Sequence, residues 1–195
     1  MGTPGVAGVL ATVDLTFAHE WTAEILPERP LILPRRQFVY PHYAEEVERG
    51  ALEVMVRPAD GEPFLGTFAL GFSDPAAPSG LWSCPDPHWI CVVSGGYAYL
   101  VNTSSPDEFA QVEYRPVLEV RALAERGLLL FAGHRALLAC GVAGLAWQTA
   151  RISWEGVRIT GVEGSWLYGM GWDLRTDSEV PFRVDLDTGE HILGG

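Results

Sequence analysis

The chain has 195 residues, 48% of them hydrophobic, and its 25 acidic side chains outnumber 13 basic ones to give a formal net charge of −12. A chain of this length buries roughly 70% of its unfolded surface, so we expect a real core rather than a disordered protein. The acidic excess argues against nucleic acid and anionic membranes, which are bound through Lys and Arg. It fits either solubility or docking on a basic protein partner.

All 13 basic residues are arginines. Without lysine the chain has no Walker-type phosphate loop, no Schiff-base lysine and no Ser-Lys dyad. Its three cysteines are an odd number, and no positively charged segment precedes the weakly apolar run at the N-terminus, so no secretory signal is predicted. We therefore expect a cytoplasmic protein with reduced thiols.

Short apolar runs and prolines alternate in the N-terminal half of the chain. Four prolines within residues 22–41 argue against a helix or a central strand there and predict an extended surface segment. Residues 43–50 are the one helical candidate, because glutamates occupy the first turns and Gly50 can end the helix. Strands are predicted at residues 6–17, 37–40, 51–57 and 63–72.

The middle of the chain contains a loop rich in Pro, Ser and Gly at residues 73–89. This loop is the candidate for a domain boundary, but the absence of a flexible linker favours one domain over residues 1–195. A tight hairpin is predicted over residues 90–102. Residues 111–123 predict one bulged strand, in which Pro116 marks an edge or a break.

From residue 127 to residue 190, short apolar runs are separated by small clusters of turn-forming residues. This rhythm is typical of an antiparallel meander. Residues 128–147 are long enough to span a bilayer, but Arg135 near their middle would cost about 2.5–3.5 kcal/mol there, so two buried strands are expected. In total we predict an all-β fold of 12–14 short strands and one helix, arranged as a sandwich or as a partial or small propeller.

The end of this meander carries a recognisable succession of motifs. Trp166-Leu167-Tyr168-Gly169 is followed by the strand Phe182 to Leu186 and by Asp187-Thr188-Gly189-Glu190. This succession resembles a blade of the quinoprotein-like β-propellers, and residues 144–149 resemble the opening of a following blade. The resemblance covers about residues 128–190 and implies the hairpin arrangement of a blade, not the quinone cofactor. The chain as a whole looks like bacterial proteins without an assigned function.

Alternation along residues 165–172 places large side chains on one face of a predicted strand and small ones on the other. The first face carries Trp166, Tyr168, Met170 and Trp172. If this face is exposed, it is a platform for a ligand or a partner. If it is buried, it forms half of the core, and the large area of aromatic side chains favours burial.

Two groups of side chains have compositions that suit metal ions. Cys84, His88 and Cys91 lie within eight residues and could hold zinc, although a Cys84–Cys91 disulfide and inert thiols are alternatives, and the apolar run at Cys91 favours inert thiols. The second group is in the acidic loops near the C-terminus and consists of Asp173, Asp185 and Asp187. These carboxylates could bind calcium, but Asp-Thr-Gly at residues 187–189 is also typical of a β-turn.

No catalytic motif is found in the sequence. There is no Gly-x-Ser-x-Gly elbow, and the five histidines lack metalloprotease spacing. We therefore expect a non-catalytic, β-rich binding or interaction module for a basic protein partner or a small ligand, without a required cofactor. The alternative is a hydrolase-type enzyme or a metal-binding protein that uses the acidic loops near Asp173 and Asp185. Open sheet edges could also pair with another copy to give a homo-oligomer.

Overall fold

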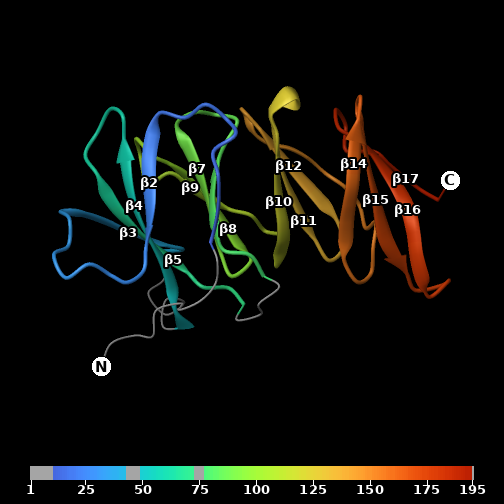
Figure 1. Ribbon diagram of the computed structural model, residues 1–195, viewed down its shortest axis with the longest axis horizontal. Helices are drawn as coiled ribbons and strands as arrows, with labels where there is room; N and C mark the ends of the chain where they lie inside the picture. Colours follow the sequence, from blue (N-terminus) through green and yellow to red (C-terminus); the bar gives the residue numbers. More distant parts are fainter. Residues whose placement is uncertain (1–10, 43–48, 73–76, 195) are drawn as a thin grey trace. The chain divides into compact units, whose positions relative to one another are not determined.

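The computed structural model describes residues 11–42, 49–72 and 77–194. Within these ranges the chain forms strands β1 to β17 in four sheets, and its one described helix is the 3-10 turn Ala124–Arg126 (Figure 1). The predicted all-β class is confirmed, with more strands than expected because three-residue strands such as β9 and β17 carry little pattern. Most of the predicted helix at 43–50 lies outside the described residues.

The chain divides into two compact units, residues 1–116 and 117–195. The loop at 73–89 lies inside the first unit, and the prediction of a single domain stays a prediction. The single strand expected over 111–123 is wrong. Residues 109–111 and 117–123 instead form two strands of different sheets, because Pro116 has no N–H to donate and separates them.

The first unit contains two sheets. One has the order β1 (Thr12–Asp14), β6 (Gly80–Ser83), β7 (Trp89–Ser94), β8 (Tyr97–Asn102) and β9 (Phe109–Gln111). The other has the order β2 (Trp21–Leu26), β4 (Ala51–Pro58), β5 (Phe64–Ala69) and β3 (Arg36–Tyr40). Neighbouring strands are antiparallel except β1 with β6 and β3 with β5, which are parallel.

Aromatic rings fill the space between these two sheets. Phe68 stacks on Tyr40 with 4.7 Å between ring centroids and lies 5.6 Å from Tyr99 of the other sheet. The strand predicted at residues 51–57 is confirmed as β4, in which Leu52, Val54 and Val56 are buried and the residues between them are more exposed. Two strands were not expected. Residues 21–26 form β2 because the first proline of that region comes only after them, and β6 lies in the predicted loop.

The second unit consists of two four-stranded sheets, each in chain order. The first contains β10 (Val117–Leu123), β11 (Leu128–Gly133), β12 (Leu137–Gly141) and β13 (Gly144–Gln148). The second contains β14 (Val157–Glu163), β15 (Trp166–Asp173), β16 (Ser178–Asp185) and β17 (His191–Leu193). All their pairs are antiparallel, as the predicted meander requires.

Apolar side chains from both sheets share the core of the second unit. Leu130, Leu137, Ile159, Leu167 and Val184 belong to one buried cluster. The apolar window 128–147 forms β11 and β12, which are buried, and the more exposed β13. No helix in the described ranges combines the length and the apolar composition needed to cross a bilayer.

Candidate functional site

The aromatic side of β15 faces solvent. Tyr168 is 36% exposed, and Trp166, Met170 and Trp172 are half-buried, whereas Leu167 on the opposite side is 0% exposed. The prediction from side-chain size, that the aromatic face is buried, is therefore wrong. The core is formed by the side of β15 that carries Leu167 and two glycines.

Close neighbours explain why the glycine side of β15 is the buried one. A Cβ atom at Gly169 would collide with the ring of Phe182, and one at Gly171 would lie 2.5 Å from the carbonyl oxygen of Ile152. The missing side chains thus leave room for groups from other segments, which pack directly on the backbone of β15. The larger side chains at every second position of β15, from Trp166 to Trp172, have no room on this side and point outward.

Carboxylates flank the end of the aromatic face at Trp166. In the sheet register Trp166 lies opposite Glu163 of β14 and Asp185 of β16, and such cross-strand partners share a face. Arg183, opposite Tyr168, places its guanidinium 4.7 Å from the centre of the Trp166 ring. This end of the face already holds one cation on an aromatic ring.

An ion pair crosses the other end of the face. Arg158 of β14 donates from Nη2 to Oε2 of Glu179 on β16 at 2.8 Å, and these residues lie opposite Met170 and Trp172 in the register. Both side chains are about half exposed, so the pair adds little stability. It does neutralise both charges. Among the described residues, neither Glu163 nor Arg183 forms an ion pair, and with Asp185 the charges at the Trp166 end of the face sum to −1.

Asp185 and Asp187 belong to a turn. Asp185 Oδ1 accepts the N–H groups of Asp187 at 2.8 Å and Thr188 at 3.2 Å, and Gly189 adopts a φ of 74°. The turn that the Asp-Thr-Gly sequence indicates is present, and Asp185 rather than Asp187 accepts its backbone hydrogen bonds. Trp147 packs against this glycine, where a Cβ atom would lie 2.9 Å from the indole.

The structure does not bring the third acidic residue to this turn. Asp173 pairs with Ser178 at one end of the β15–β16 hairpin, and Asp185 pairs with Trp166 at the other. At about 3.3 Å per residue the two carboxylates are on the order of 20 Å apart along the strand. In the described part of the chain, no three His, Cys, Asp or Glu side chains are grouped closely enough to hold a metal ion.

The structure does not gather Cys84, His88 and Cys91 into a metal site either. All three cysteines of the chain are described, are buried and form no disulfide. His88 instead lies on the surface at a turn before β7, with its Nδ1 atom 3.6 Å from Oε2 of Glu20. Burial raises the pKa of the Cys140 thiol to about 11, so this thiol is a poor nucleophile near neutral pH.

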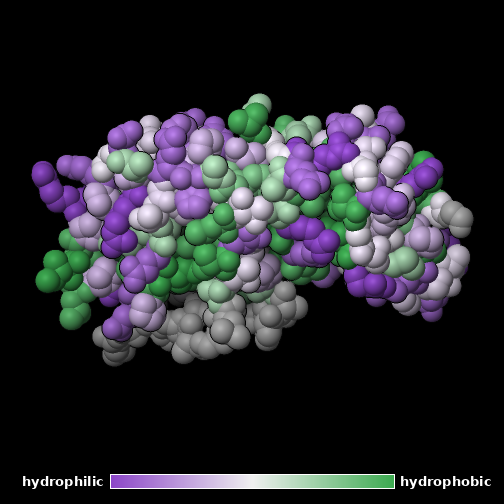
Figure 2. All heavy atoms as spheres, turned by 45° about the horizontal axis from the view of Figure 1, so that its top comes forward, coloured by the Kyte–Doolittle hydropathy of each residue, from purple (hydrophilic) through white to green (hydrophobic). Residues whose placement is uncertain are grey.

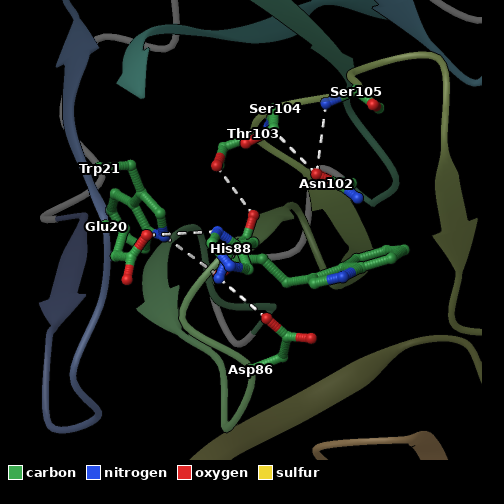
Figure 3. Close-up of polar contacts among 9 residues, drawn as sticks. Glu20, Trp21, Asp86, His88, Asn102, Thr103, Ser104 and Ser105 are labelled. Carbon is green, nitrogen blue, oxygen red and sulfur yellow. Dashed lines mark hydrogen bonds and ion pairs between the residues drawn. The ribbon is translucent and has the colours of Figure 1, made fainter. Parts of the chain in front are cut away.

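The surroundings of His88 form a polar cluster that the sequence does not reveal. Figure 3 shows that Glu20 and Trp21 approach His88 from a distant part of the chain. The N–H of His88 donates to Asp86 Oδ1 at 2.9 Å, and the Thr103 hydroxyl donates to the His88 carbonyl at 2.8 Å. These bonds hold the turn in place. The cluster borders an open hollow of about 370 Å³ that His19 and Arg57 also line.

The side chains at the centre of this cluster are exposed to solvent. Both His88 and Glu20 have side chains that are about half exposed, and their contact is an exposed ion pair. His19 binds the Phe17 carbonyl oxygen through Nδ1 at 2.9 Å, and its ring lies 4.7 Å from the ring of Trp21. We interpret these contacts as stabilising the start of β2.

No family model, curated protein or solved structure matches the chain.

Proposed function

We propose that the protein is a non-catalytic interaction module that binds a basic segment of a partner protein on the aromatic side of β15. The observation that carries this proposal is the outward orientation of Trp166, Tyr168, Met170 and Trp172. Tyr168 is exposed and the other three side chains are half-buried, and aromatic residues are enriched at the centres of interfaces.

The charges on this face support a cationic partner. A Lys or Arg over an aromatic ring contributes about 0.5–2 kcal/mol, and the contact between Arg183 and Trp166 shows the geometry within the chain itself. Tyr168 offers a second, more exposed ring, and Glu163 offers an uncompensated carboxylate. The net charge of −12 would speed the encounter with such a segment.

The alternative of a hydrolase or metal-binding protein that acts through Asp173 and Asp185 has less support. The register separates these carboxylates, and Asp185 is engaged in its turn. For the cellular setting we propose the cytoplasm, in keeping with three buried thiols.

We also propose that the second unit consists of two propeller-like blades. Each of its sheets is an antiparallel meander of four strands, and the sheets begin at Val117 and Val157, which are 40 residues apart. A propeller blade is a four-stranded sheet of about 40–45 residues.

The test is a calorimetric titration of the 195-residue chain with an oligoarginine peptide at two salt concentrations. We expect the double variant Tyr168→Ala/Trp172→Ala to bind at least about tenfold more weakly than the wild type. Glu163→Gln should weaken binding and reduce its salt dependence.

Two controls separate this face from general acidity. Phe72 is an aromatic residue of the first unit that is 42% exposed, so Phe72→Ala should leave the affinity unchanged. Asp60→Asn removes one exposed carboxylate of the first unit and should also have no effect. Equal affinities for the wild type and the Tyr168/Trp172 variant would sink the proposal.

A further inference from the structure

The ring of Trp166 is covered by a cation from the chain itself. The guanidinium of Arg183 lies 4.7 Å from the ring centre, which is within the range of a cation–π contact. In the sheet register Arg183 lies opposite Tyr168, whereas Trp166 lies opposite Asp185. Arg183 therefore reaches diagonally from β16 to the ring of Trp166 and leaves Tyr168 as the more exposed of the two aromatic residues.

No hydrogen bond or ion pair holds the guanidinium of Arg183 within the described part of the chain, and the residue is exposed. The nearby carboxylate of Asp185 instead accepts two N–H groups of its own turn, at 2.8 and 3.2 Å. An exposed cation–π contact changes an equilibrium constant by only about two- to fivefold. A cation from another molecule can therefore compete with Arg183 for the same ring.

The surroundings of Trp166 stay negative even with Arg183 in place. Glu163 and Asp185 flank Trp166 in the register, so their two negative charges exceed the single positive charge of Arg183. Strands β15 to β17 lie at the right of Figure 1, and at the same end Figure 2 shows mainly hydrophilic and pale surface with small apolar areas. This surface suits a charged group better than an aliphatic one.

We propose that Arg183 is an internal competitor, which occupies the cation site on Trp166 and thereby limits the affinity of this face for its partner. An arginine of the basic partner segment takes the place of Arg183 on the ring, and Arg183 turns into solvent. Tyr168 is the ring that the partner contacts without such competition. This inference rests on the proposed function, because it concerns the same face, and it adds a residue that acts against binding.

The test is a calorimetric titration of the 195-residue chain with an oligoarginine peptide, in a double-mutant cycle of Arg183→Gln and Trp166→Ala. Arg183→Gln should bind the peptide about fivefold more tightly than the wild type, because the ring of Trp166 is then vacant. When Trp166 is replaced by alanine, the same change at Arg183 should alter the affinity by less than about twofold. The cycle thus separates competition for the ring from the loss of one positive charge.

The matched control is Arg115→Gln. Arg115 is also exposed and lies over an aromatic ring, 4.8 Å from the centre of Tyr97, but it belongs to the first unit. Its replacement removes the same charge and should alter the affinity by less than about twofold. Circular dichroism confirms that each variant is folded.

Two results would overturn the inference and leave the proposed function standing. One is equal tightening by Arg183→Gln with and without Trp166, which would reduce the role of Arg183 to its charge. The other is an Arg183→Gln variant that binds the peptide no more tightly than the wild type does. If neither the wild type nor Arg183→Gln binds the peptide, both the inference and the proposed function are wrong.

Discussion

Strands β11 and β15 both belong to the core of the second unit, yet they contribute to it in different ways. β11 is buried along its whole length and is apolar at nearly every position. β15 alternates, with Leu167 and two glycines inside and the largest side chains outside. The comparison shows that side-chain size does not decide which face of a strand is buried. The neighbours that must approach the strand decide it.

The largest expected effect separates the two faces of β15. Leu167→Ala should lower the free energy of unfolding by about 2–5 kcal/mol, because it leaves a cavity in the shared core. Tyr168→Ala, one position along the strand, should lower it by less than about 1 kcal/mol. Urea unfolding followed by circular dichroism measures both. Equal losses would show that the two faces are not different.

The pH dependence of stability tests how deeply Cys140 is buried. This residue lies on β12, beside β11. Burial raises the pKa of Cys140, which pairs with Leu129, from 9 to about 11. The unfolded chain therefore releases this proton at a lower pH than the folded chain. Stability is unaffected below pH 9 and should fall by about 2–3 kcal/mol as the pH rises through 11.

The control for this titration is Cys140→Ala, which removes the titrating group. The wild type and this variant are compared by urea unfolding at pH 8 and pH 11, and the variant should lose less stability between these values by about 2–3 kcal/mol. If both lose the same amount, burial of this thiol does not contribute to the alkaline instability.

The close packing on β15 can be disturbed by a single methyl group. Gly169→Ala should destabilise the protein by about 1–3 kcal/mol, because its Cβ atom collides with the Phe182 ring. Gly161 on the neighbouring strand has no atom within 4 Å of the place that a methyl group would take, so Gly161→Ala is the matched control and should change stability by less than about 1 kcal/mol. A similar cost for both would contradict the packing argument.

The smallest expected effect concerns the ion pair on the outer face. A double-mutant cycle with Arg158→Ala and Glu179→Ala should give a coupling energy of about 0.2–1 kcal/mol, since both side chains are about half exposed. The coupling should decrease at high salt. A coupling above about 2 kcal/mol would mean that this face is more shielded from water than described.

The meander of the second unit could be predicted from sequence because turns and apolar runs are local features. Within each sheet the hairpins are marked by their own turn residues, and consecutive strands of the same sheet pair with each other. Proline positions were less informative. Four prolines in residues 22–41 led us to predict an extended surface segment there. The residues of β2 precede the first of these prolines, so the strand was missed.

The orientation of β15 could not be predicted in the same way. Alternation defines two faces, but the burial of one face depends on Phe182 and Ile152, which come from other segments. The cluster at His88 has the same origin, because Glu20 lies far from it in sequence. Such contacts are set by sheet pairing, and no local pattern of residues marks them.

The central claim is that the aromatic face of β15 is exposed to solvent and the leucine and glycine face is buried. Thiol labelling of Tyr168→Cys and Leu167→Cys tests it directly, since the native cysteines are all buried and give a low background. We predict that Tyr168→Cys reacts within about tenfold of the rate of the unfolded chain, whereas Leu167→Cys reacts only as the protein opens. Rapid labelling at position 167 together with protection at position 168 would contradict the account.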